Sequence, residues 1–256
     1  MLAPTRWRVR RPVAAVIAVV ALVLALAVVV VDHWNKEKPM PVQGHVASAI
    51  TTEDLTAVAH TSGFFGHQSV GMNMLNAIPG IYTDRGVSAP SIEQGRVEAT
   101  PNGGFIAHQF IGENTKPLLK IEDFNRTMRD GMARQVDVAL MKLCSLDITS
   151  STDVDALFAR YRDTMAALER DFPDVTSIHV TVPLTIEPNV LSRLKTLVKK
   201  LLGRSDQFGQ ADNVARERLN ALIRREYGGH HLFDLAAIES TKPDGTRVFG
   251  RYDNQE

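Results

Sequence analysis

Segments typical of buried strands alternate with amphipathic helical segments along most of the chain, and this alternation constrains the fold more than any other feature. The run Val136–Cys144 is almost wholly apolar, as in a strand that is buried on both faces. The amphipathic pattern of Asp153–Phe172 follows it, and the β-rich segment Thr176–Val182 comes next. Strands separated by helices favour a parallel sheet with helices on both faces. The sequence therefore predicts an α/β fold with three layers.

Weaker patterns extend this prediction to the rest of the chain. A capped helix is expected to begin at Thr51, since Thr51 and Asp54 have the spacing of a capping box. The helix from Ser69 is expected to end at Ile78, because Pro79 and Gly80 follow. Further strands are predicted at Ala57–Phe65, Ser91–Ala99 and Leu232–Ala237, and further helices at Lys116–Met132, Val190–Leu202 and Asp206–Tyr227.

An unbroken apolar run of 19 residues, Val13–Val31, lies near the N-terminus. As a helix it would span ~28 Å, close to the thickness of the hydrocarbon core of a bilayer. Four arginines and no acidic residue precede it, which favours a cytoplasmic N-terminus. We expect a basic cytoplasmic segment at 1–12, a transmembrane signal anchor at 13–31, a linker at 32–52 and an extracytoplasmic domain at 53–256. A cleaved signal peptide is the alternative interpretation of the same run.

The distribution of charge argues against one class of partner. The chain has 29 basic and 29 acidic residues, and four of the basic residues lie before the apolar run ends. The remainder therefore has 25 basic and 29 acidic residues, a net charge of −4. A nucleic-acid-binding domain normally has a basic excess, so we expect no nucleic-acid partner. The single cysteine, Cys144, excludes an internal disulfide and a cysteine-rich zinc site, and is expected to be a buried strand residue.

In parallel sheets, ligands bind beyond the carboxyl ends of the strands. The predicted strands place four segments there, namely Gly66–Gly71, Pro101–Gly104, Lys142–Asp147 and Pro183–Asn189. In the first segment, Ser69 lies at a strand-to-helix turn flanked by Gly66 and Gly71. Glycines allow a tight turn, and free N–H groups at a helix N-terminus stabilise an oxyanion. Ser69 is therefore a candidate nucleophile, and a simple helix N-cap is the alternative.

The run Gly66-His67-Gln68-Ser69-Val70-Gly71 resembles the first block of the SGNH/GDSL hydrolase superfamily, in the bacterial branch that has Gly-His-His/Gln-Ser in place of Gly-Asp-Ser. Similar counterparts occur in order at Pro101–Gly104, Met141–Cys144, Thr181–Thr185 and Phe233–Leu235. The resemblance implies a flavodoxin-like parallel sheet and ester hydrolysis through an acyl-serine intermediate, with neither metal nor organic cofactor. It also implies that Ser69 is the nucleophile and that the N–H groups of Ser69 and Gly104 hold the oxyanion.

The chain departs from the pattern of that superfamily in two places. The third block usually has an oxyanion asparagine, whereas Cys144–Asp147 has none. Lys142 and Asn102 are candidate substitutes for the missing donor. The superfamily also has a C-terminal Asp-x-x-His pair that activates the serine, and the sequence ends at Glu256 without one.

Three explanations for the missing pair remain open. The chain is a truncated form, a different histidine serves as the base, or the serine site is kept only for binding. The candidate histidines are His67, His108, His179, His230 and His231. His60, His67 and His108 could converge near the strand ends, but they lack metal-ligand spacing, so no metal site is expected.

The expected function is that of a membrane-anchored SGNH-like serine esterase, inactive if the base has been lost. Its expected substrate is an ester, such as that of a lipid or a cell-envelope polymer. The apolar face and basic side of Val190–Leu202 fit either a core helix or a membrane-surface helix. The alternative function is that of a non-catalytic, membrane-anchored binding or scaffold protein with the same fold.

Overall fold

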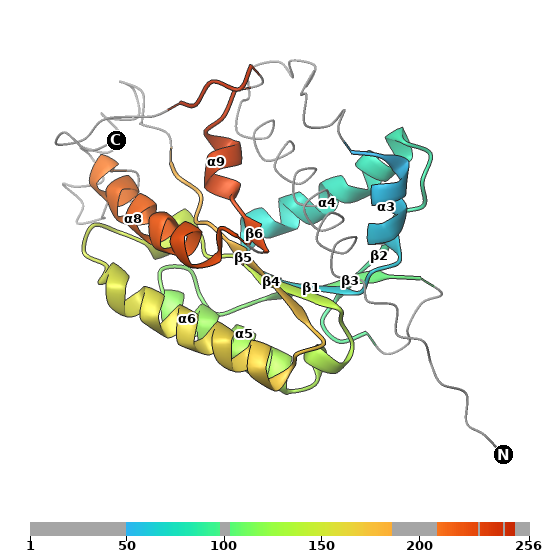
Figure 1. Cartoon of the computed structure of the whole chain (residues 1–256), viewed down its shortest axis with the longest axis horizontal. Helices are drawn as coiled ribbons and strands as arrows, with labels where there is room; N and C mark the ends of the chain where they lie inside the picture. The colour runs from blue at the N-terminus through green and yellow to red at the C-terminus, as the bar shows by residue number, and fades with distance from the viewer. Residues whose placement is uncertain (1–49, 98–102, 186–208, 230, 243, 249–256) are drawn as a thin grey trace.

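The computed structural model describes residues 50–97, 103–185, 209–229, 231–242 and 244–248. In this part of the chain, six parallel strands form one sheet in the order β2-β3-β1-β4-β5-β6 (Figure 1). The strands are β1 (Gly63–His67), β2 (Ser91–Gln94), β3 (Phe105–Phe110), β4 (Val138–Met141), β5 (Thr176–Val180) and β6 (Leu232–Phe233). Without the edge strand β2, the remaining strands follow the order of a flavodoxin-like sheet. The prediction of an α/β fold with a parallel sheet is confirmed.

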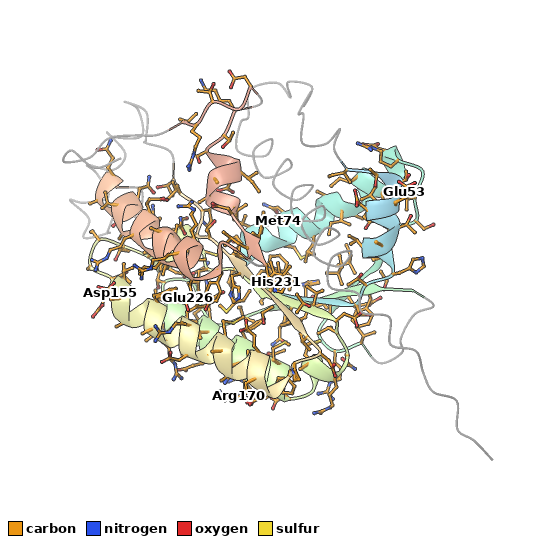
Figure 2. The ribbon with its side chains drawn as sticks, viewed as in Figure 1. Glu53, Met74, Asp155, Arg170, Glu226 and His231 are labelled. Atoms are coloured by element: carbon orange, nitrogen blue, oxygen red, sulfur yellow. The ribbon has the colours of Figure 1, made fainter. Side chains whose placement is uncertain are left out.

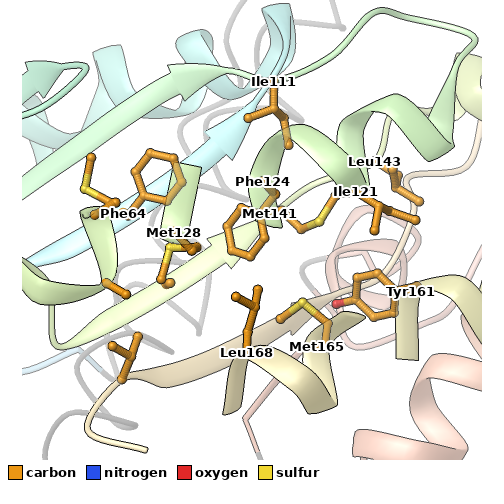
Figure 3. Close-up of a cluster of buried hydrophobic side chains, with 14 of the residues drawn as sticks. Phe64, Ile111, Ile121, Phe124, Met128, Met141, Leu143, Tyr161, Met165 and Leu168 are labelled. Atoms are coloured by element: carbon orange, nitrogen blue, oxygen red, sulfur yellow. The ribbon is translucent and has the colours of Figure 1, made fainter. Parts of the chain in front are cut away.

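Helices cover both faces of the sheet. One face is covered by α3 (Thr52–Ala59), α4 (Ser69–Asp84) and α9 (Leu235–Glu239), and the other by α5 (Pro117–Arg129), α6 (Val154–Asp171) and α8 (Gln210–Tyr227) (Figure 1). Successive side chains of β1 enter opposite cores, since Phe64 packs with α5 and α6 while Phe65 packs with α3 and α4. Figure 3 shows the first of these cores, in which the Phe64 and Phe124 rings stack at 5.8 Å. The sheet is thus buried on both faces, as the apolar strand patterns require.

Several predicted elements are confirmed with small changes of boundary. The strongest strand pattern forms β4, and the helix predicted at Asp153–Phe172 is α6, with Asp153 as its N-cap and Phe172 as its C-cap. The capping box at the start of α3 is also present, since Thr51 and Asp54 each accept a hydrogen bond from the backbone N–H of the other. These segments are specified locally, by hydrophobic periodicity and capping side chains.

Two predicted strands are partly wrong. Ala57–Phe65 contains the end of α3 and the start of β1, because Val58 continues the buried face of the helix begun by Leu55. In Leu232–Ala237, the strand stops after two residues because Asp234 caps α9 by accepting a hydrogen bond from the Ala237 N–H. An aspartate that satisfies a free helix N–H favours a helix start over a continued strand.

The predicted end of the helix after Ser69 is also wrong, because α4 continues through Pro79 to Asp84. Beyond the proline, Tyr82 is fully buried and its hydroxyl donates to the Leu55 carbonyl at 3.1 Å. The Thr83 hydroxyl donates to the Pro79 carbonyl at 2.8 Å. Tertiary contacts of the last turn therefore outweigh the backbone hydrogen bond that a proline removes.

Two glycines of α4 are expected to respond oppositely to the same substitution. A Cβ on Gly71 would lie 2.4 Å from the Cβ of His67, whereas a Cβ on Gly80 would meet nothing within 4 Å. Gly71→Ala is therefore expected to lower the free energy of unfolding by about 1–3 kcal/mol through overpacking. Gly80→Ala is expected to raise it by up to ~1 kcal/mol, the usual gain in a helix. Urea unfolding of the full chain, followed by circular dichroism, measures both; equal effects would contradict the close packing at Gly71.

The expected membrane anchor lies outside the described residues, as do the basic segment before it, most of the linker and the helix predicted at Val190–Leu202. Among the helices that the structure does describe, none is long and apolar enough to cross a bilayer.

Candidate active site

Strands β1 and β4 lie side by side at the centre of the sheet, and their following connections diverge. The chain leaving β1 returns through β2 and β3 on one side, while the chain leaving β4 continues to β5 and β6 on the other. The carboxyl ends of two such strands form the topological switch point at which open α/β sheets bind ligands. Ser69 follows β1 and Lys142 follows β4, so the structure brings both predicted residues to this edge.

Ser69 is the first residue of α4, and its side chain is exposed. The N-cap is Gln68, whose side-chain amide instead donates to the carbonyls of Ile111 and Gly112, at 2.9 Å each. The interpretation of Ser69 as an N-cap is therefore wrong. Its hydroxyl has no hydrogen-bond partner among the described residues. A free hydroxyl at the first turn of a helix can approach a carbonyl carbon, and the helix dipole favours the negative charge that would develop there.

A pair of buried histidines lies beneath this turn. The Nε2 atom of His67, at the end of β1, lies 3.1 Å from Nδ1 of His108 on β3. The Nδ1 atom of His67 lies 3.0 Å from the carbonyl oxygen of Gln68. The relative exposures of the two residues are 0% and 3%. Because both ring nitrogens of His67 are engaged, this ring is not placed to take a proton from Ser69.

Burial lowers the pKa of His67 to about 4, with smaller lowering contributions from His108 and Lys142. In the unfolded chain the pKa is about 6.5, so the unfolded state binds more protons between these two values. Stability from His67 is thus fully present above about pH 6.5 and is lost as the pH falls through about 4. The expected loss is ~3 kcal/mol in the free energy of unfolding, measured by urea unfolding at a series of pH values.

The variant His67→Asn has no titrating ring, so its stability should fall less steeply over this range. Glu239 changes the stability with pH in the opposite direction. Burial raises its pKa to about 7, so its contribution to the free energy of unfolding is present in acid and is lost as the pH rises through about 7. Comparing wild type and variant at each pH removes this contribution. Identical pH slopes for the two proteins would show that His67 does not titrate as described.

Lys142 is fully buried beside His67, and its backbone N–H donates to the Gly66 carbonyl at 3.0 Å. Its amino group makes two long contacts, 3.4 Å to the Leu143 carbonyl and 3.6 Å to Sγ of Cys144. Within the described residues, no carboxylate lies at ion-pair distance from it. A buried lysine that lacks a carboxylate is costly, and such groups are concentrated at functional sites. Cys144 itself is buried, as predicted.

Gly104 does not lie at the same edge as Ser69. It precedes β3, at the amino end of the sheet, and its N–H donates to the Ala59 carbonyl at 2.8 Å. The sequence predicts Pro101–Gly104 at the carboxyl end of a strand, whereas its described part, Gly103 and Gly104, leads into the start of β3. Gly104 is therefore not placed to bind an oxyanion at Ser69. The other candidate from this segment, Asn102, lies outside the described residues.

A buried ion pair that no sequence pattern indicates joins two loops at the carboxyl edge. The Lys120 amino group lies 2.6 Å from Asp147, and neither side chain is exposed. Asp147 also accepts hydrogen bonds from the N–H groups of Cys144, at 2.6 Å, and Thr115, at 2.8 Å. The loop after β3 is thereby fastened to the loop after β4. Asp147 was within a segment already expected at this edge, but nothing in the spacing identified Lys120 as its partner.

Arg216 makes a similar connection between the loops after β4 and β5. Its guanidinium donates to the Ser145 carbonyl at 2.9 Å and to the Thr185 hydroxyl at 2.8 Å. The side chain is fully buried, although it lies on the arginine-rich helix α8. An arginine on a charged helix face usually lies in solvent, whereas Arg216 is buried and connects two loops.

The remaining candidate histidines lie elsewhere. His179 is in β5, where Nδ1 lies 3.0 Å from the Tyr161 hydroxyl and Nε2 lies 3.3 Å from Glu169. His231, labelled in Figure 2, directly precedes β6 and so lies at the amino end of that strand. His60 is the C-cap of α3, before β1, and His230 lies outside the described residues. No histidine in the described ranges contacts Ser69, and no group of three potential metal ligands occurs among them.

Comparison of the chain with protein-family models, with curated proteins and with solved structures finds no match.

Proposed function

We propose that the chain is an SGNH-like serine esterase that hydrolyses an ester through an acyl-Ser69 intermediate. The observation that carries this proposal is the exposed hydroxyl of Ser69, which has no hydrogen-bond partner in the described part of the chain and lies at the first turn of α4, at the topological switch point of the sheet. Ser69 would attack the ester carbonyl, and its own N–H would hold the oxyanion, because the first N–H groups of a helix have no partner within the helix.

Lys142 is the charged group proposed to support the oxyanion from the neighbouring strand. It follows β4 at the same edge, and a buried positive charge acts strongly in a low-dielectric site. In this proposal Lys142 replaces two oxyanion donors. One is the asparagine that Cys144–Asp147 lacks, and the other is the N–H of Gly104, which lies at the opposite edge of the sheet. No proton acceptor is assigned among the described histidines.

The proposed substrate is an ester of a lipid or of a cell-envelope polymer, at a membrane to which the apolar run of residues 13–31 would anchor the domain. Exposed apolar side chains at the carboxyl edge support an apolar substrate. Phe110 ends β3 and is 42% exposed, and Leu118 and Leu119 at the start of α5 are 48% and 39% exposed.

A second candidate function is that of a binding protein without turnover. One observation favours it: no described histidine or carboxylate contacts the Ser69 hydroxyl, and a serine without a base is a weak nucleophile. In this case the same edge of the sheet would bind an ester or an acyl group and release it unchanged.

Covalent labelling separates the two functions. The full chain in detergent is treated with an alkyl fluorophosphonate, which reacts with activated serines, and the product is digested for mass spectrometry. The esterase proposal expects one adduct on Ser69 and none in Ser69→Ala. A folded wild-type protein that forms no adduct, or that forms it on another residue, would overturn the esterase proposal and leave the binding function.

A further inference from the structure

We propose that His67 and His108 are positioning residues that hold the Gln68–Ser69 peptide, so that the Ser69 N–H faces the oxyanion of the substrate. This inference rests on the proposed function, and it assigns a role to a buried pair that the nucleophile itself does not contact.

Two hydrogen bonds fix the direction of the Gln68–Ser69 peptide group. The Gln68 carbonyl accepts two hydrogen bonds, from Nδ1 of His67 at 3.0 Å and from the Gly71 N–H at 2.7 Å. This peptide is trans, like the other described peptides, so its C=O and N–H point in opposite directions. Because the carbonyl is held toward the buried ring, the Ser69 N–H is directed away from that ring.

The same hydrogen bonds define where the protons of the histidine pair lie. A carbonyl oxygen can only accept, so Nδ1 of His67 carries the proton and Nε2 is the acceptor. The 3.1 Å contact then requires that Nδ1 of His108 donate to Nε2 of His67. His67 is neutral in this arrangement, and one chain of hydrogen bonds runs from His108 through His67 to the Gln68 carbonyl.

The surroundings of the pair maintain this neutral state. Phe65 and Phe110 lie at ring-centroid distances of 4.8 and 5.1 Å from His67, and α4 covers the ring at Gly71. Burial lowers the pKa of both histidines. Among the residues that the structure describes, the charged group facing the pair is Lys142 after β4, which lowers the pKa of His67 further. Glu239, the last residue of α9, interacts in turn with Lys142.

Protonation would break the chain of hydrogen bonds. A second proton on His67 would occupy Nε2 and face the Nδ1–H of His108, so two donors would oppose each other. The Nδ1–H of the protonated ring would still face the Gln68 carbonyl, but repulsion between the two opposed donors would displace the ring, and the oxyanion donor would lose its fixed direction. The turnover number should therefore fall in acid, while substrate binding changes little.

The activity test compares two replacements of His67 in the full chain in detergent, with p-nitrophenyl acetate as substrate. His67→Leu removes the donor to the Gln68 carbonyl, whereas the side-chain amide of His67→Asn can still donate to it. His67→Leu is expected to lower kcat by ~10²-fold with KM nearly unchanged, on the scale of losing an oxyanion donor. His67→Asn should restore much of kcat and should lack the acid limb of the pH profile. The surface variant His60→Asn is the control.

A folded His67→Leu protein that keeps the wild-type kcat would overturn the inference, whereas absence of both hydrolysis and Ser69 labelling in wild type would overturn the proposed function. A second measurement, by NMR, tests the inference without measuring activity. Long-range ¹H–¹⁵N spectra of the histidine rings should show that His67 is neutral at neutral pH with its proton on Nδ1. The amide resonance of Ser69 should shift in His67→Leu and much less in His67→Asn. A His67 ring that is protonated on Nε2 would overturn the inference.

Discussion

In the proposed serine esterase, ester hydrolysis by the full chain is expected to fall by at least ~10³-fold in kcat when Ser69 is replaced by alanine, as for the loss of a nucleophile in other hydrolases. The side chain is exposed and has no hydrogen-bond partner among the described residues, so its removal should change the free energy of unfolding by less than ~0.5 kcal/mol. The loss of activity would therefore report on chemistry and not on folding. Release of p-nitrophenol from p-nitrophenyl acetate measures it.

A matched control lies at the other end of the same strand. Ser62 directly precedes β1, at the amino edge of the sheet, where its N–H donates to Asp137. Ser62→Ala should leave kcat within about twofold of wild type, since this edge is away from the ligand side of a parallel sheet. Equal activity in wild type and Ser69→Ala would exclude Ser69 as the nucleophile, whatever the overall rate.

The free energy of unfolding is expected to fall by about 3–5 kcal/mol in Lys120→Met, because this change leaves the buried Asp147 carboxylate without its cation. The two side chains are fully buried at 2.6 Å, and Asn114 also accepts a hydrogen bond from Lys120 at 2.9 Å. Urea unfolding followed by circular dichroism measures the loss. The loops after β3 and β4 should also become mobile together, because Asp147 connects them.

Two further variants show whether the effect comes from the buried pair. Lys116→Met removes the cation of an exposed pair with Glu113 on the same loop, and it should cost less than ~1 kcal/mol. The double variant Lys120→Met/Asp147→Leu removes both buried charges, so it should lose less than the sum of the two single variants. A loss in Lys120→Met as small as that in Lys116→Met would mean that Asp147 is not buried as described.

The candidate site shows where reasoning from the sequence ends. The place of Ser69 at a strand-to-helix turn could be predicted because its features are local: a serine between glycines, after an apolar segment. Gly104 was misplaced because its role depended on which end of a strand it occupies, and the weak pattern after Ser91 did not locate β3. The sequence suggested that His67 and His108 could converge near the strand ends, but it did not predict the contact between their rings, because 41 positions separate the two residues and only the register of β1 with β3 brings the rings together.

Local physical chemistry in the sequence determined the class of fold, the strongest elements and the turn at Ser69. Periodicity and capping act over a few residues, so β4, α6 and the start of α3 could be predicted directly. Tertiary structure alone decided that α4 continues past Pro79, that Lys120 pairs with Asp147 and that Arg216 is buried. Each of these three features depends on burial by segments that are distant in the sequence. Burial lowers the local dielectric, so a buried polar or charged side chain needs a polar partner. A single sequence shows which residues are charged, but only the tertiary structure shows which charged residues form pairs.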